Sequence, residues 1–308
     1  MFTTKPHPSA LIGLDGASVW LNSEPLSAAG LRGRVTLVDF WTYSCVNWLR
    51  TLPYVRAWHE RYRERGLVVV GAHAPEFGFE HDLDNVRRAA TELGVGYPVV
   101  IDNDFAIWRS FENHYWPAVY LVDRDGRVRF HHFGEGAYEE TERAIQRLLG
   151  VDGETARVEA GGFAEAADWG TLGSPETYVG HARGEPRTGR RADGLALNEW
   201  ALAGRWTVEE ESAVLETASG SIAYRFQARD VNLVLAPPAS GAPVRFSLRL
   251  DGQPPGDAHG IDVDEGGEGV VSEPRMYQLV RQGGAVAERT FEITFLDPGV
   301  RAYVFTFG

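Results

Sequence analysis

The sequence predicts two domains, an α/β domain over residues 1–150 and an all-β sandwich of jelly-roll type over residues 195–308, joined by a linker over residues 151–194. The chain has 308 residues, more than one usual domain, so each part is long enough to bury its own core. In the first part, short apolar runs alternate with helical patterns, as in a mixed α/β sheet. In the last part, short apolar runs follow one another with Gly and Pro turns between them, which is typical of a β-sandwich.

Within the α/β domain, the run VTLVDF at 35–40 is short, apolar and rich in β-branched residues, which favours a buried central strand. A short hairpin and loop is expected before it, over 18–34. Strands are expected over 35–40, 67–73, 97–102, 118–123 and 127–133. Helices are expected over 45–65, with an interruption at Pro53, and over 81–93, 105–112 and 138–149.

The linker and the second domain follow the last of these helices. Residues 151–194 are rich in Gly, Glu, Ala and Arg and show no clear periodicity, so we expect a long segment packed on the surface. Strands of the sandwich are expected over 206–208, 221–227, 231–235, 244–250, 269–272, 276–281, 289–295 and 302–307.

Composition excludes several classes of function. A net charge of −13 argues against binding to nucleic acid or to anionic membrane surfaces. The chain contains no apolar run of the ~18 residues that a membrane helix needs, and residues 1–14 lack the features of a signal peptide. We therefore expect a cytoplasmic protein, or an extracytoplasmic one if the sequence is part of a longer chain. No cofactor is expected.

The chemistry of the α/β domain centres on Cys45, the one cysteine of the chain. A single cysteine excludes an intramolecular disulfide and a multi-cysteine metal site. Cys45 falls where a strand has ended and a helix begins, and the positive end of a helix favours the thiolate. Asp39 lies six residues earlier on the buried strand, where a carboxylate is costly unless it is hydrogen-bonded or takes part in proton transfer.

These residues and their spacing resemble the thioredoxin superfamily. In that family a strand ending in Asp-Phe-Trp leads to a Cys-x-x-Cys helix that contains a proline five residues after the second cysteine. Asp39, Phe40, Trp41, Cys45 and Pro53 are in register with this pattern. The resemblance implies a thioredoxin-like (redoxin) fold for residues 1–150.

Further motifs narrow the resemblance to the soluble C-terminal region of DipZ-type redoxins. They include WTYSC, NWLRTLPYVRAW, HAPEFGFE and HYWPAVYLVD in the first domain, and SPETYVG, DVNLVL, HGIDVDE and FLDPGV in the rest of the chain. The resemblance implies that Trp116–Pro117 is the family's cis-proline, which pairs with the substrate backbone. It also implies that the second domain resembles a carbohydrate-binding module.

The chain departs from the family at Trp48, which stands where the family has its resolving cysteine. Position 48 is one helical turn after Cys45, so the indole is expected beside the sulfur, as a lid or as a replacement that abolished the redox function. A dithiol site releases a mixed disulfide through its second thiol, and that step is not available here. In the family the buried aspartate takes a proton from the second cysteine, so Asp39 is expected to be a relic or to act through water on an incoming thiol.

The first hypothesis for function is a thiol-disulfide oxidoreductase with a monothiol site, whose partners are a thiol or disulfide protein or a low-molecular-weight thiol. The second is a one-cysteine peroxidase, because Thr42 precedes Cys45 with the Thr-x-x-Cys spacing of peroxiredoxins. The third is a non-catalytic binding protein in which Cys45 is a buried hydrophobe. Candidate catalytic residues are Cys45, Asp39 and Thr42, and candidate substrate-binding residues are Trp41, Trp48, Trp116, Pro117 and Glu76, the last being otherwise an ordinary loop residue.

No metal site is expected. Neighbouring residues of a strand point to opposite faces, so His131 and His132 cannot bind one ion together. The acidic loop 257–265 offers oxygen ligands suited to calcium but lacks the EF-hand spacing, which indicates a solvated turn. A glycan is a candidate partner of the sandwich if its aromatic residues are exposed, although at strand spacing they are expected in the core. These residues are Trp200, Trp206, Tyr224, Tyr277 and Tyr303.

Overall fold

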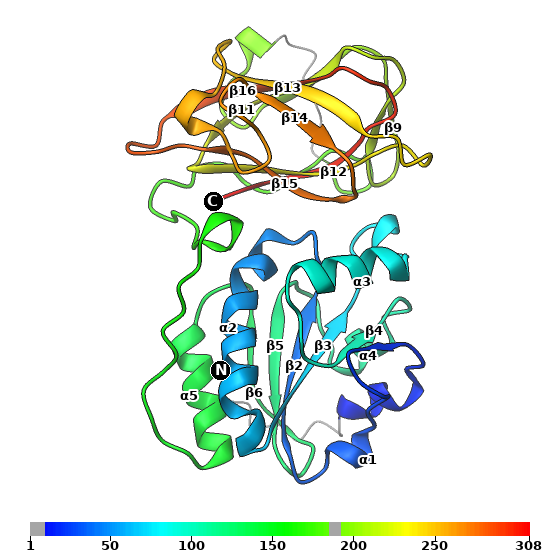
Figure 1. Ribbon diagram of the computed structural model, residues 1–308, viewed down its shortest axis with the longest axis vertical. Coiled ribbons are helices and arrows are strands. Elements are labelled where there is room, and N and C mark those ends of the chain that lie inside the picture. The colour runs from blue at the N-terminus through cyan, green and yellow to red at the C-terminus, as the bar shows by residue number, and fades with distance from the viewer. Residues whose placement is uncertain (1–9, 185–191) are drawn as a thin grey trace. The chain divides into compact units, whose positions relative to one another are not determined.

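The computed structural model describes residues 10–184 and 192–308. The chain divides into two compact units at the bond between Ala164 and Glu165. The first unit is α/β and the second contains the β-sandwich (Figure 1).

The first unit is built on one six-stranded sheet with the order β1-β4-β3-β2-β5-β6. Its strands are β1 (Trp20–Leu21), β2 (Val35–Trp41), β3 (Leu67–His73), β4 (Val99–Ile101), β5 (Ala118–Val122) and β6 (Val128–Phe133). Its α-helices are α1 (Ala28–Leu31), α2 (Val46–Tyr62), α3 (Leu83–Glu92), α4 (Ala106–Ser110) and α5 (Tyr138–Leu149). Short 3-10 helices lie at η1 (Ala10–Gly16), η2 (Arg63–Arg65), η3 (Gly78–His81) and η4 (Gly162–Ala164).

The central strand β2 is buried along its whole length, as expected for a short β-branched run. It pairs in parallel with β3 and antiparallel with β5, with Trp41 opposite His73 and Phe40 opposite Ala118. The ends of β2 and β3 and the start of β5 therefore meet at one edge of the sheet. The loops that leave this edge carry Cys45, Glu76 and Pro117.

Alternation along β2 divides its side chains between the two faces of the sheet. Val38 and Phe40 belong to a core cluster that also holds Leu11, from η1, and Ile107, from α4. Asp39 lies on the opposite face, where Trp48 of α2 contacts it. The sheet thus lies between two layers of helices (Figure 1).

The segment 18–34, expected as a hairpin, is not one. Trp20 and Leu21 form β1, which pairs with the distant strand β4. Ser27 accepts a hydrogen bond from the backbone of Gly30 and begins the short helix α1, so side-chain capping competes with turn formation here. α2 continues through Pro53 from Val46 to Tyr62.

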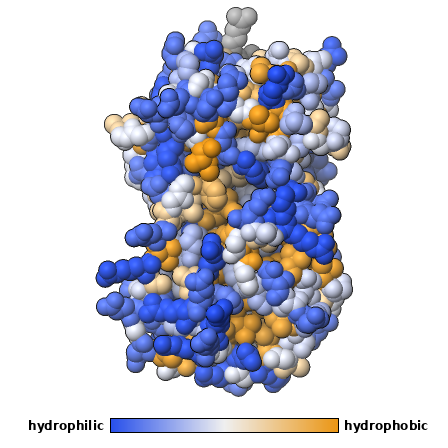
Figure 2. All heavy atoms as spheres, in the orientation of Figure 1, coloured by the Kyte–Doolittle hydropathy of each residue, from blue (hydrophilic) through white to orange (hydrophobic). Residues whose placement is uncertain are grey.

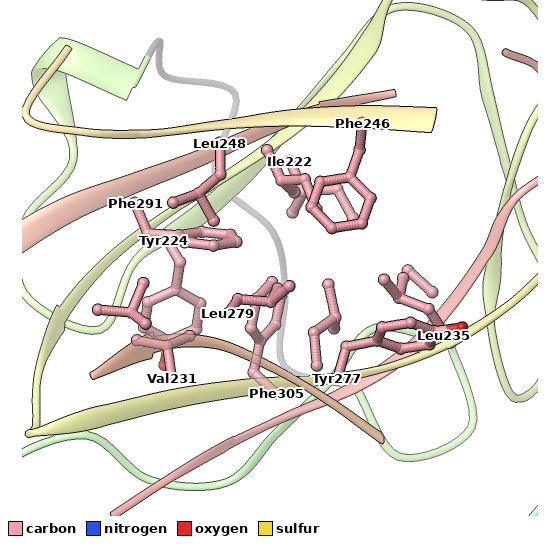
Figure 3. Close-up of a cluster of buried hydrophobic side chains, with 14 of the residues drawn as sticks. Ile222, Tyr224, Val231, Leu235, Phe246, Leu248, Tyr277, Leu279, Phe291 and Phe305 are labelled. Atoms are coloured by element: carbon pink, nitrogen blue, oxygen red, sulfur yellow. The ribbon is translucent and has the colours of Figure 1, made fainter. Parts of the chain in front are cut away.

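The second unit is a sandwich of two antiparallel sheets. One sheet has the order β15-β12-β17-β10-β9, with β7 on β17, and the other has the order β14-β13-β16-β11-β8. Large apolar side chains from both sheets fill the space between them, as the labelled residues of Figure 3 show. The strands are β7 (Thr177–Tyr178), β8 (Trp200–Ala203), β9 (Trp206–Val208), β10 (Ala213–Leu215), β11 (Gly220–Gln227), β12 (Asp230–Ala236), β13 (Val244–Leu250), β14 (Glu268–Val271), β15 (Arg275–Arg281), β16 (Glu288–Phe295) and β17 (Arg301–Phe307).

Part of the segment expected as a linker, 151–194, belongs to this sandwich. β7 lies in it and pairs with β17, with Tyr178 opposite Val304. The hydroxyl groups of Thr177 and the buried Tyr224 form a hydrogen bond of 2.8 Å. A strand of two residues leaves no periodic signal, so the sequence does not reveal it. Residues 185–191 of the expected linker lie outside the described residues.

Hydrophilic side chains predominate on the face drawn in Figure 2, with hydrophobic side chains in groups between them. Across residues 10–184 and 192–308, no helix combines the length and the apolar character needed to cross a membrane.

Candidate active site

Cys45 is the N-cap residue of α2, and its side chain is partly exposed. Its backbone N–H donates to the carbonyl of Thr42 at 3.3 Å, which closes the turn between β2 and the helix. Its carbonyl accepts from Leu49 at 3.0 Å, the first hydrogen bond of the helix. The sulfur therefore lies at the end of α2 where backbone N–H groups and the helix dipole stabilise negative charge.

Asp39 is fully buried on the face of β2 that α2 covers. Its Oδ2 accepts hydrogen bonds from Trp48 Nε1 at 3.0 Å and from the Tyr97 hydroxyl at 3.3 Å. Its Oδ1 has no hydrogen-bond partner in the part of the chain that the structure describes. Burial raises the pKa of Asp39 to about 7, and the two hydrogen bonds act in the opposite direction.

Trp48 is not a lid over the sulfur. Its side chain is fully buried and turned inward, where it donates to Asp39 and stacks on Trp41 with ring centroids 4.3 Å apart. The expectation that the indole tunes access to Cys45 is therefore wrong, because the ring gains a buried hydrogen bond and a stacking partner beneath the helix. The indole N–H occupies an oxygen of the carboxyl that, in the family, takes the proton of the resolving thiol.

Trp41 is also fully buried, so it cannot contact a substrate directly. Its ring lies edge-on to His73, with centroids 4.9 Å apart. The space for it exists because residue 71 is glycine: a Cβ there would lie 2.8 Å from Trp41 Nε1 and 3.0 Å from a ring carbon of Tyr97. Trp41 thus supports Trp48 from below and has no surface role.

Thr42, the residue on which the peroxidase hypothesis depends, is fully buried. Its hydroxyl lies near the carboxyl of Glu80 and helps to lower the pKa of that group. The hydroxyl oxygen is itself buried, and this position does not favour contact with a peroxide at Cys45.

Glu76, a candidate substrate contact, is half-buried in the loop after β3. The same loop contains a second glutamate, Glu80, which the sequence reasoning missed and which is fully buried. Glu80 Oε1 accepts from the Ser44 hydroxyl at 2.6 Å, and Oε2 accepts from the backbone N–H groups of Glu76 at 2.6 Å and Phe77 at 3.0 Å. The spacing Glu-x-x-x-Glu within HAPEFGFE is the only signal in the sequence, and it does not distinguish a buried carboxyl from an exposed one.

Trp116 and Pro117 are joined by a cis peptide bond directly before β5. Pro117 is buried and Trp116 is half-buried, and the indole N–H of Trp116 donates to the carbonyl of Ala74 at 3.0 Å. Ala74 in turn donates its N–H to the carbonyl of Trp41 at 3.0 Å. These bonds connect the loops after β2 and β3 and before β5, so the structure brings Cys45, Glu76 and Pro117 to the same edge of the sheet.

Among the described residues, no group of three or more His, Cys, Asp or Glu side chains is placed to hold a metal ion. In the acidic loop 257–265, Asp262 forms an ion pair of 2.7 Å with Arg275, and Asp264 accepts from the backbone of Glu268 at 2.8 Å. These carboxylates therefore stabilise the loop through contacts with protein groups.

Of the five aromatic residues considered for sugar stacking, four are buried and Trp206 is half-buried. Trp206 is held by a hydrogen bond of 2.9 Å from its indole N–H to the carbonyl of Ala203. The aromatic residues therefore serve mainly the core of the sandwich.

The sheet order, and a cysteine at the start of the helix after the central strand, define a thioredoxin-like redoxin. Residues 15–149 match the Redoxin family, and residues 174–308 match the family described as "Thioredoxin like C-terminal domain". The chain is 30% identical to the thiol-disulfide oxidoreductase YkuV of Bacillus subtilis (strain 168) over 136 residues, which are 44% of this chain and 91% of YkuV. It belongs to the thioredoxin-like family of thiol-disulfide oxidoreductases.

Within that family the chain is DipZ-like along almost its whole length. It is 32% identical to Protein DipZ of Mycobacterium tuberculosis (strain CDC 1551 / Oshkosh) over 311 residues, which are 96% of this chain and 42% of that protein. A shorter match, 34% identical over 131 residues, joins it to Protein SUPPRESSOR OF QUENCHING 1, chloroplastic, of Arabidopsis thaliana, of which it covers 12%. The chain thus spans less than half the length of the DipZ relatives that it matches.

Proposed function

We propose that this protein exchanges disulfides through a single thiol, Cys45. The observation that carries the proposal is the position of Cys45, a partly exposed N-cap residue of α2 in a redoxin fold. The thiolate is the reactive form, and the start of a helix stabilises it.

In the proposed reaction the Cys45 thiolate attacks one sulfur of a partner's disulfide. A bond forms between the two sulfurs, the partner's disulfide bond breaks, and its second sulfur leaves as a thiolate that takes a proton from water. Trp116 and Pro117 would hold the partner's backbone, and Glu76 would lie beside it. An external thiol then attacks the mixed disulfide and releases Cys45, because Trp48 supplies no second thiol.

A trapping experiment tests this reaction. The protein is incubated with oxidised insulin, and the products are separated without reductant and identified by mass. We expect a long-lived adduct at Cys45 that added glutathione releases, and no adduct with Cys45→Ser. If the wild-type thiol reacts with iodoacetamide but forms no adduct with insulin, Cys45 is accessible but does not exchange disulfides, and the proposal fails.

The peroxidase hypothesis has less support, because Thr42 is buried beside Glu80. Consumption of hydrogen peroxide by the wild-type protein, absent in Cys45→Ser, would revive it. A glycan partner for the sandwich is also only a proposal, and its test is binding of the second unit to an oligosaccharide array.

A further inference from the structure

The turn that presents Cys45 is fixed from behind by a buried carboxyl. Ser44 immediately precedes Cys45, is itself buried, and donates its hydroxyl proton to Glu80 Oε1 at 2.6 Å. Thr42, at the other end of the turn, lies near the same carboxyl. One side chain from the loop after β3 is therefore hydrogen-bonded to the residue that immediately precedes Cys45.

Glu80 is held rigidly enough to act as an anchor. Its Oε2 accepts from two successive backbone N–H groups, those of Glu76 and Phe77, so rotation of the carboxyl would break both hydrogen bonds. It closes the first turn of η3 by the same contacts. Burying a carboxyl costs more desolvation free energy than burying an apolar side chain of similar size. The hydrogen bonds to Glu80 must offset that cost.

Resting on the function proposed above, we propose that Glu80 is a positioning residue for Cys45. Through Ser44 it holds the turn from which the sulfur is presented, and through its negative charge it opposes ionisation of the thiol. Burial raises the pKa of Glu80 to about 7, so the carboxyl is ionised over the alkaline range in which an ordinary thiol titrates. In that range the Cys45 thiolate would follow directly the residue that is hydrogen-bonded to a negatively charged carboxylate.

The expected chemical effect concerns both steps of disulfide exchange. A thiolate of higher pKa is a stronger nucleophile but a poorer leaving group. Glu80 would therefore lower the fraction of thiolate near neutral pH but stabilise the mixed disulfide once it has formed and slow its release, which suits a site that holds its partner until an external thiol arrives.

Other ionisable groups surround the turn and must be kept unchanged in a test. Glu76 raises the pKa of Glu80 by charge repulsion, whereas burial lowers the pKa of His73 to about 3 and keeps it neutral. Further groups to keep unchanged are His81, which also lowers the pKa of His73, Asp39 beneath α2, and the ion pair of 2.9 Å between Arg50, on α2, and Glu135.

The test is the rate of Cys45 alkylation by iodoacetamide as a function of pH. In Glu80→Gln the amide can accept from the backbone through its oxygen and donate to Ser44 through its nitrogen, so the geometry is kept and the charge is removed. We expect the apparent pKa of Cys45 to fall by about half a unit or more, which is roughly threefold more thiolate on the acidic side of the curve. Glutathione should also release the insulin adduct faster than in the wild type.

Two further variants separate charge from position. Glu92→Gln removes an exposed charge at the end of α3 and should leave the pKa of Cys45 unchanged. Ser44→Ala breaks the link between Glu80 and the turn but leaves the charge, so its own shift in the pKa of Cys45 reports position, and the further shift on adding Glu80→Gln reports charge.

A pKa of Cys45 that is equal in the wild type and in a folded Glu80→Gln overturns the proposal, and so does an equal shift in Glu92→Gln. These outcomes are independent of disulfide exchange, because alkylation needs no partner protein. A shifted pKa without any insulin adduct would leave Glu80 as a positioning residue and reject the monothiol reaction.

Discussion

At the scale of single residues, the exchange of a thiol for an indole at position 48 changes what the buried carboxyl does. One carboxyl oxygen of Asp39 accepts hydrogen bonds from the Trp48 N–H and the Tyr97 hydroxyl. In a dithiol enzyme of the family, the same carboxyl would serve the second cysteine. Here its hydrogen bonds hold the indole in place, so Cys45 must rely on the helix end for activation.

Replacing Trp48 by cysteine should restore a resolving thiol. We expect Trp48→Cys to reduce insulin about tenfold faster than the wild type, because an internal thiol replaces the external one. The matched control is Trp48→Ser, which leaves the same cavity without a thiol. Both variants should lose about 3–5 kcal/mol of unfolding free energy, so assays need conditions in which circular dichroism shows a folded protein. Equal activity of the two variants would contradict the monothiol reading of the wild-type site.

The raised pKa of Asp39 makes stability depend on pH. Its pKa is about 7 when folded against 3.8 as the ordinary value, so between these pH values the folded state binds the proton that the unfolded state has lost. The contribution of Asp39 to the unfolding free energy therefore falls as pH rises from about 4 to about 7, and stays low above that.

The replacement Asp39→Asn removes this dependence while an amide oxygen still accepts from Trp48. We expect the unfolding free energy of the variant, relative to that of the wild type, to be a few kcal/mol higher at pH 8 than at pH 5, since each pKa unit corresponds to about 1.4 kcal/mol. Urea unfolding of both proteins at the two pH values measures it. A difference between the two proteins that is constant over this range would show that Asp39 does not titrate there.

At the scale of secondary-structure elements, strong periodicity gave reliable predictions. The strand 67–73 and the helix 138–149 match β3 and α5 residue by residue, because each has a continuous apolar or helical pattern. The sequence did not reveal the short strands β7 and β8. It also did not reveal that β1 pairs with the distant strand β4. In the site, local spacing pointed to Cys45 and Asp39 and the family resemblance to Pro117, whereas the burial of Glu80 and the inward turn of Trp48 depend on packing that no local pattern encodes.

β3 contributes to the site through the absence of a side chain. We expect Gly71→Ala to destabilise the protein by about 1–3 kcal/mol, because its Cβ would lie 2.8 Å from Trp41 Nε1 and displace the ring on which Trp48 rests. Gly96→Ala, where a Cβ meets nothing within 4 Å, is the matched control and should be close to neutral. Thermal unfolding of the two variants decides the matter, and equal melting temperatures would contradict this packing argument.

At the scale of the whole molecule, each unit has its own core. The segment expected as a linker, 151–194, is divided between the two units at Glu165. Glu165, the first residue of the second unit, pairs with Arg229 at 3.2 Å and with Arg281 at 2.8 Å. Both arginines also bind the buried Asp230. Glu165 and β7 are therefore joined to the sandwich by these ion pairs and by the pairing of β7 with β17.

This division predicts the behaviour of isolated fragments. A fragment of residues 165–308 should unfold cooperatively, whereas one of residues 195–308 lacks β7 and the hydrogen bond of 2.8 Å between Thr177 and Tyr224. We expect the shorter fragment to melt several degrees lower, since a loss of about 1 kcal/mol lowers Tm by about 4 °C in a domain between these size classes. Equal melting temperatures would place the boundary at 195.

The stacked indoles of Trp41 and Trp48 should also affect the optical spectra of the protein. Two transition dipoles with ring centroids 4.3 Å apart couple, so the pair should give an exciton signature in the circular dichroism spectrum. One of the two chromophores donates a hydrogen bond to Asp39. The signature should therefore change as that carboxyl titrates, which gives the buried site an intrinsic spectroscopic reporter that needs no label and leaves Cys45 unmodified.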